Sequence, residues 1–222
     1  MQQFATPAPI STVLDIPAGR ITFIAADRAD TTVEIRPADA GKSRDVKAAE
    51  RIEVGYADGV LRVEAQKPSS QLLGSSGSVE VTIQVPAGSR VEAKAAAAEF
   101  RGVGRLGDVT VEVAQGPVQL DEAADAQLTL QAGDVSIGRL GGSARISTQK
   151  GNLTVTEAVA GTVTLRTEQG DITVGAAREA AASLDAGTTY GRIHNALRNA
   201  EGGTDLTIHA TTVHGDITAR TR

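Results

Sequence analysis

The chain of 222 residues has no cysteine and no tryptophan, and only 2% of it is aromatic. Without cysteine there are no disulfide bonds, thiolate nucleophiles or cysteine-ligated metal sites. So few aromatic rings also argue against stacking surfaces for sugars or single-stranded nucleic acids. A core with so few rings has to be built from Val, Ile, Leu and Ala, which suits narrow, closely spaced layers. The aromatic residues are Phe4, Phe23, Tyr56, Phe100 and Tyr190.

Positive charge and long apolar runs are also scarce. The net charge is −5 and the isoelectric point is about 5.3, so the chain has no basic excess for nucleic-acid binding. No apolar run approaches the roughly 18 residues that span a bilayer. The opening MQQFATPAPISTVLDIPAG lacks the charged and apolar regions of a secretory signal. We therefore expect no nucleic-acid partner, no direct membrane span and a cytoplasmic location.

What the sequence does contain is an internal repeat. Glycines followed by an apolar-x-apolar stretch recur, and GDITV at 170–174 returns almost unchanged as GDITA at 215–219. Between these stretches lies a second alternating set, such as TVTLRT at 162–167 and DLTIHA at 205–210. Each repeat therefore predicts two short strands joined by polar, glycine-rich corners. The repeat glycines from the second onward are Gly116, Gly133, Gly151, Gly170, Gly191 and Gly215.

One such repeat cannot bury its apolar face alone, but repeats stacked at about 4.8 Å can. The sequence thus predicts an all-β, single-stranded β-solenoid or β-helix-like stack, with regular two-strand coils over residues 101–222 that follow one another in sequence order. The alternation places apolar residues inward on two facing walls. They are Val135, Ile137, Leu153, Val155, Ile172 and Val174 on one wall, and Ile146, Leu165, Leu184 and Ile208 on the other.

The first half, residues 1–100, is less regular and predicts an irregular antiparallel β region that caps the same stack. Asp58-Gly59 suits the tight turn of a hairpin over residues 52–65. One helical turn is expected at residues 45–51, and an exposed loop at 68–77. Because no long linker is present, we expect a single domain over residues 1–222.

Two further columns accompany the glycines and are interpreted as structural. Thr148, Thr167, Thr188 and Thr212 precede four successive repeat glycines by three residues. Their side chains are expected to point inward at a corner, where a buried hydroxyl needs a hydrogen-bond partner. The residue after each glycine forms the second column, in which a neutral or positive residue is expected to separate every Asp. This column is Asp134, Asn152, Asp171, Arg192 and Asp216.

Catalytic and metal chemistry find little support in this pattern. His194, His209 and His214 fall on different walls or corners and do not converge, so no metal site and no cofactor are predicted. Parallel β-helices also carry polysaccharide-acting enzymes, which use clustered carboxylates. The regularly spaced carboxylates of Asp134, Asp171 and Asp216 have neither an aromatic platform nor a basic cluster beside them, and we interpret them as corner residues.

The strongest departure from the pattern lies at Tyr190, Arg192, His194 and Asn195. An apolar residue is expected where Asn195 stands. Either the strand ends one residue early, or an inward amide is held by backbone groups. Breaks in a regular pattern are where function concentrates, so these four residues are the candidate binding site.

Several phrases resemble those of a bacterial family of β-strand-repeat proteins of unknown function, labelled "putative adhesin". They are IPAGRITFIAADRADTTVEIRP, VPAGSRVEAKA, GTTYGRIHNALRN and TIHATTVHGDITARTR. The resemblance implies a solenoid-like or roll-like fold and no catalytic residues. Some relatives are tied to cell-envelope stress.

Together these features predict a non-enzymatic structural or interaction module with a protein partner. Two alternatives remain open: an envelope-stress partner of a membrane protein, and a β-helix enzyme acting on polysaccharide. The open ends of a stack are unpaired strand edges, so homo-oligomers through these edges are also expected. Arg220 and Arg222 are predicted to guard the last coil, formed by the C-terminal repeat.

Overall fold

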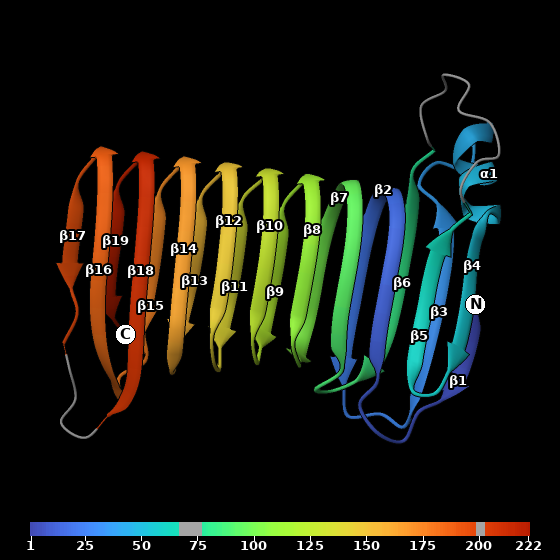
Figure 1. The fold of residues 1–222 in the computed structure, drawn as a ribbon. Coiled ribbons are helices and arrows are strands. Elements are labelled where there is room, and N and C mark those ends of the chain that lie inside the picture. The colour runs from blue at the N-terminus through green and yellow to red at the C-terminus, as the bar shows by residue number, and fades with distance from the viewer. Residues whose placement is uncertain (67–76, 199–202) are drawn as a thin grey trace.

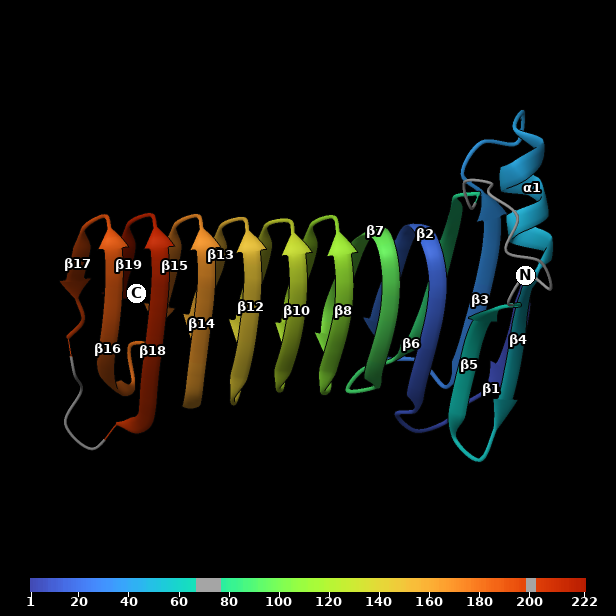
Figure 2. The ribbon, with the colours of Figure 1, turned by 45° about the horizontal axis from the view of Figure 1, so that its top comes forward.

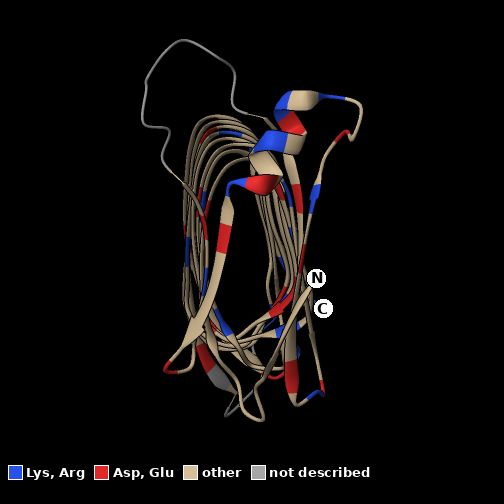
Figure 3. Ribbon diagram, turned by 90° about the vertical axis from the view of Figure 1, so that its right-hand side faces the viewer, with Lys and Arg blue, Asp and Glu red and all other residues tan. Residues whose placement is uncertain are grey.

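The computed structural model describes residues 1–66, 77–198 and 203–222. The expected loop at 68–77 lies almost wholly outside these residues. The described chain winds into a flattened tube with two facing walls, one strand of each coil in each wall (Figure 1; Figure 3). The all-β, solenoid-like class predicted from the repeat is confirmed. No helix in the described part of the chain is long and apolar enough to cross a bilayer.

The walls of the regular coils are parallel throughout. The first wall, in spatial order, contains β8 (Val109–Gln115), β10 (Ala126–Ala132), β12 (Ala144–Lys150), β14 (Gly161–Gln169), β18 (Thr204–His214) and β16 (Ala180–Tyr190). The second wall contains β9 (Val118–Ala123), β11 (Val135–Leu140), β13 (Leu153–Ala158), β15 (Ile172–Ala176), β19 (Ile217–Thr221) and β17 (Ile193–Ala196).

Apolar side chains fill the space between the walls in columns. Ile146 stands beside Leu165 on the first wall, and Leu153 stands beside Ile172 on the second. All four are at most 1% exposed. Because successive side chains of a strand point to opposite faces, the apolar half of each alternating stretch is buried and the polar half is solvated. The inward positions predicted from the sequence are buried, except that Leu184 is only half-buried.

The parallel stack begins well inside the first half of the chain. The long strands β2 (Ser11–Ala26) and β7 (Arg90–Leu106) each turn a corner and contribute to both walls. β2 also pairs in parallel with β5 (Val60–Ala65) and β6 (Val79–Pro86). Phe23 and Phe100 stack between the walls with ring centroids 5.6 Å apart. The prediction of an irregular antiparallel region over residues 1–100 is therefore only partly right.

Antiparallel pairing is confined to the N-terminal end. It involves β1 (Gln2–Ala5), β3 (Asp30–Pro37) and β4 (Ile52–Ala57), paired with one another or with β5 and β6. The β4–β5 hairpin is confirmed, and its turn residues Asp58 and Gly59 have φ of 52° and 76°. The helix α1 (Ser43–Glu50) starts earlier than predicted. Its buried Asp45 accepts a hydrogen bond from the backbone amide of Ser78 at 3.0 Å.

The coils do not follow sequence order at either end of the stack. β18 lies between β14 and β16, and β19 lies between β15 and β17, so the last repeat in sequence is the second-last in space (Figure 2). At the other end β2 lies between β7 and the β5–β6 coil. At the C-terminal end the chain thus passes beyond one coil position and returns to fill it, which overturns the expectation of consecutive coils over residues 101–222. At the N-terminal end β2 comes first in sequence, and later strands pair on both of its sides.

We call the last repeat in sequence, β18 and β19, the inserted repeat. Its position in the stack explains why two pentapeptides are nearly identical. GDITV at 170–174 and GDITA at 215–219 lie side by side, with Ile172 opposite Ile217 and Val174 opposite Ala219. Asp171 and Asp216 are therefore neighbours, so the expected separation of every Asp by a neutral or positive residue is wrong. Arg220 and Arg222 belong to this inner repeat and do not guard the outermost coil, because β17 lies beyond β19.

Candidate interaction site at the open end of the stack

The corners of the coils leave no room for a side chain at the repeat glycines. Gly170 has φ of +150°, and a Cβ there would lie 2.1 Å from the carbonyl oxygen of Gly151. The same close approach recurs along the column, and for Gly191 the blocking oxygen is that of Gly215. The backbone of the adjacent coil occupies the space at every corner, and all of these glycines except Gly191 also have a positive φ, which favours glycine. The column is Gly116, Gly133, Gly151, Gly170, Gly215 and Gly191 in spatial order.

The threonine column lies directly beneath these corners. The hydroxyl of Thr167 donates to the carbonyl of Gly151 at 3.1 Å, and that of Thr212 donates to Gly170 at 3.0 Å. Thr188 donates to Gly215 at 3.0 Å, and Thr148 to Lys150 at 3.3 Å. Thr188 is half-buried, whereas the others are at most 5% exposed. Each hydroxyl satisfies a corner carbonyl, as a buried polar group requires.

The residues after the glycines form a ladder of side chain to backbone bonds. The side-chain oxygens of Asn152, Asp171 and Asp216 each accept from the backbone amide of the next residue in the column, all at 2.8 Å. Asp134 accepts from Asn152 at 2.7 Å. The side chains of Asp171 and Asp216 can be neighbours because each accepts a hydrogen bond from the backbone amide of the adjacent corner.

The ladder ends at Arg192 on the outermost coil. Its guanidinium lies 3.0 Å from the Asp216 carboxylate, and its backbone amide donates to the same side chain at 2.8 Å. These two bonds, the backbone one first, lower the pKa of Asp216 from its ordinary 3.8. Because Arg192 is 89% exposed, the ion pair itself adds little stability. The two contacts together join the corner of the terminal coil to that of the inserted repeat.

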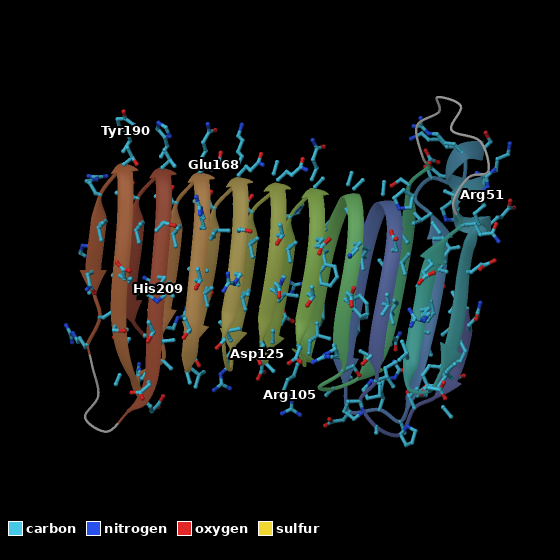
Figure 4. All side chains as sticks on the ribbon, in the orientation of Figure 1. Arg51, Arg105, Asp125, Glu168, Tyr190 and His209 are labelled. Carbon is cyan, nitrogen blue, oxygen red and sulfur yellow. The ribbon has the colours of Figure 1, made fainter. Side chains whose placement is uncertain are left out.

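Tyr190 stands at the top of the same corner (Figure 4). Its ring stacks on the imidazole of His214, with centroids 4.8 Å apart and planes inclined by 15°. Tyr190 is nonetheless 66% exposed. The stack therefore holds one face of the phenol ring and leaves the remainder available to a partner.

Asn195 does not end its strand, and it stands on the inward side of β17, opposite the buried Ala219. β17 runs through it to Ala196, and its side-chain oxygen accepts from the amide of Leu197 at 3.0 Å. The interpretation of an early strand end is therefore wrong, whereas an amide on the inward side held by a backbone group is what the structure shows, although this side of the terminal coil is exposed. Every residue of β17 is exposed, because this coil is the outermost in space and has no following coil to bury against. The polar Asn195, at a position where the other repeats have an apolar residue, therefore lies at the end of the stack.

The three histidines lie apart, as the alternation predicts. His194 is on exposed β17, His209 is on β18 with Nδ1 3.3 Å from the carboxylate of Asp185, and His214 lies under Tyr190. Within residues 1–66, 77–198 and 203–222, no group of three or more His, Asp or Glu side chains is arranged to hold a metal ion.

The outer edge of the terminal coil is open. β16 pairs with β18 and β17 pairs with β19, and no strand of the described chain pairs with the other side of either. Leu184 and Ala186 on β16 are only half-buried, and Ile193 is 47% exposed. We name the surface formed by residues 183–190 of β16 and by β17 the open end.

Sequence reasoning found part of this surface and missed the rest. It singled out Tyr190, Arg192, His194 and Asn195, all of which lie on the terminal coil. It did not single out Ile193, and it placed Leu184 among the ordinary inward wall residues. Val213 is 41% exposed beside this corner. The sequence signal for the open end was that the polar Asn195 and the small residues Ala186 and Gly187 fall in the same repeat.

Fold and corner chemistry together define a two-walled parallel β-solenoid with an unpaired terminal coil. The family model of Toastrack DUF4097 matches residues 13–221, and the chain belongs to this family. The comparison with curated proteins gives no match.

Three solved structures resemble the chain over nearly all of its length. A putative adhesin from Parabacteroides distasonis has a TM-score of 0.51 at 13% identity, covering 98% of this chain and 95% of that one. A putative adhesin from Bacteroides fragilis has a TM-score of 0.47 at 14% identity, with coverage of 98% and 95%. A putative cell adhesion protein from Clostridium sporogenes has a TM-score of 0.47 at 10% identity, with coverage of 100% and 98%. At 13% identity, the likeness to the Parabacteroides distasonis structure shows the fold alone.

Proposed function

We propose that this protein is a non-enzymatic interaction module that binds a protein partner with the open end. The observation that carries the proposal is that no strand among the described residues pairs with the outer edge of β16 and β17, where Tyr190 is 66% and Ile193 47% exposed. Unpaired strand edges are templates for further pairing, and exposed aromatic and aliphatic side chains are typical anchors of protein interfaces.

The regular carboxylates support an interaction role over a catalytic one. Asp134, Asp171 and Asp216 each accept the backbone amide of the adjacent coil, so one oxygen of each carboxylate is committed to the corner. A polysaccharide-acting enzyme would need clustered carboxylates free to meet substrate. A groove along β7, β8, β10, β12 and β14 contains Glu92, Asp108 and Asp125 but no aromatic ring. Asp108 is paired with Arg90, and Asp125 accepts the backbone amide of Ser143 at 2.6 Å, so two of these carboxylates are held by structural contacts.

The proposal is tested by site-specific photocrosslinking in the native host. A photoreactive amino acid at Ile193 should give protein adducts, and the same group at Thr129, an exposed position of inner strand β10, should give none. Both positions carry exposed side chains, so only the location differs. Equal adducts at the two positions, or none at position 193, would contradict the proposed binding surface.

A further inference from the structure

We propose that the partner at the open end is the same end of a second copy of this chain. The two stacks meet end to end about a two-fold axis, with β16 of one copy running antiparallel beside β16 of the other. This inference rests on the proposed function and names its partner.

The shape of the open end favours another stack over a single peptide. The surface consists of one strand from each wall, β16 and β17. The incompletely buried apolar residues are Leu184 and Ala186 on β16 and Ile193 on β17. An added peptide strand could pair with only one wall and would leave the apolar residues of the other in water. A partner that covers both walls must itself have two walls at the same separation, which the end of a second copy supplies.

The two ends of the chain differ as partners. The outer strands of the N-terminal end are short, since β1 has four residues and β4 has six, and shortness is one way that proteins protect sheet edges. Phe4 and Tyr56 there pack on each other with ring centroids 5.4 Å apart. β16 has 11 residues, and among the outer strands of the two ends only the β16 of a second copy matches its length. Contact between like ends also closes the assembly as a dimer, whereas contact between unlike ends would build an open fibre.

The residues along the edge permit close pairing. From Ser183 to Tyr190, β16 contains neither lysine nor proline, and its one charged residue is Asp185. Gly187 has open space where a Cβ would stand, with no heavy atom within 4 Å. The devices that block edge pairing in other sheets, such as lysine, proline and bulges, are therefore missing from this stretch.

Charge and burial select the register. Registers that keep the same residues facing the core differ by two residues. Centring the pair on Asp185 would set two carboxylates opposite each other, which destabilises a sheet. Centring on Leu184 would leave Tyr190 beyond the paired segment. Centring on Ala186 places each Asp185 opposite Gly187 and keeps Tyr190 against the second copy.

This register also places Ser183 of one copy opposite Thr189 of the other, twice in the dimer. Both side chains are exposed and point away from the core in the isolated chain. Charges introduced at these two positions therefore meet only if the dimer forms as proposed, and they leave the core of each stack unaltered.

The test is sedimentation equilibrium of the full chain over a concentration series that reaches the millimolar range. The wild type should move from 22.8 kDa toward twice that mass as concentration rises. The Ser183→Lys/Thr189→Lys variant sets lysine against lysine and should weaken association by about tenfold or more. Ser183→Asp/Thr189→Lys sets opposite charges against each other and should associate at least as well as the wild type.

A matched control adds the same charge elsewhere. Thr129→Lys/Gln149→Lys places two lysines on exposed positions of inner strands β10 and β12, and it should associate like the wild type. Circular dichroism of each variant establishes that the strands are retained.

Three results would overturn the inference: a monomer at every concentration, an association that the paired lysines leave unchanged, or a mass that grows beyond the dimer. A monomer that still gives crosslinks from position 193 to a different protein would remove the second copy and leave the proposed function intact. A protein that is monomeric at every concentration and gives no crosslink from position 193 would contradict both the dimer and the proposed function.

Discussion

The backbone amide of Asp216 donates to the carboxylate of Asp171 at 2.8 Å, although 45 residues separate them in sequence. The terminal coil of residues 180–196 is reached first along the chain, and the final repeat then enters between it and the coil of residues 161–176. The final repeat therefore has a neighbour on both sides, and the C-terminal strands, which fray in many proteins, are held within the sheet. The exposed edge of the stack is therefore formed by β16 and β17 and not by the C-terminal strands.

The close approach of coils at the glycine corners predicts a strong penalty for any side chain there. Gly170→Ala should lower the free energy of unfolding by about 2–4 kcal/mol, because it combines left-handed backbone strain with a collision against the carbonyl of Gly151. Urea unfolding measures this loss. Gly187→Ala is the control, since its Cβ meets open space, and it should be neutral or stabilising by up to about 1 kcal/mol. Equal losses would contradict the corner argument.

Thr12 offers a stabilising substitution. Within the described residues, its hydroxyl is the one buried side-chain polar atom without a hydrogen-bond partner, and it stands in register with Leu61 and Val91. Thr12→Val should raise the free energy of unfolding by about 1 kcal/mol, because a buried hydroxyl without a partner is costly.

Thr167→Val is the matched comparison for Thr12. This change removes the hydroxyl that donates to Gly151 at 3.1 Å and should destabilise the protein by about 1 kcal/mol. Opposite signs for the same chemical change, measured by thermal unfolding, are the expected outcome. A destabilised Thr12→Val variant would show that its hydroxyl has a partner.

Acid should loosen the terminal corner. Since the folded-state pKa of Asp216 lies below its ordinary 3.8, the stabilisation is fully present above that value and is lost as the pH falls through the folded-state pKa. Hydrogen exchange of the Arg192 amide, corrected for intrinsic rates, should accelerate over this range. Asp216→Asn keeps an accepting oxygen, as Asn152 does in the same column, and should remove the pH dependence. Persistence of the acceleration in that variant would assign it to another group.

The regular coils were predictable because alternation and glycine spacing report local geometry. Val135, Ile172 and Leu165 are inward because every second residue of a strand faces one side. The hairpin at Asp58-Gly59 was found for a similar reason, since its turn needs positive φ and the residues that adopt it. These features depend on neighbours in sequence.

The order of the coils was not predictable, because each repeat is a suitable neighbour for any other. A corner glycine followed by Asp and two inward apolar residues fits above or below every such repeat, so local pattern does not select between them. The sole trace of the true order was at Asn195, where an apolar residue is missing because nothing covers the coil. That trace was interpreted either as an early strand end or as an inward amide held by backbone groups. The candidate residues lay in the right coil, but the reason for their exposure was visible only in space.

The most direct test of the coil order uses the natural absence of cysteine, which gives a clean background for engineered pairs. Thr173 stands opposite Thr218, and Thr218 stands opposite His194. Thr173 and His194 are thus two strand spacings apart, about 9.6 Å, beyond the reach of a disulfide. The Thr173→Cys/Thr218→Cys and His194→Cys/Thr218→Cys variants should oxidise to intramolecular disulfides, and Thr173→Cys/His194→Cys should remain reduced. A disulfide between positions 173 and 194, with none between positions 173 and 218, would show that the coils follow sequence order and would contradict the inserted repeat; the pair 194 and 218 are neighbours in either order and serve as the control for disulfide formation.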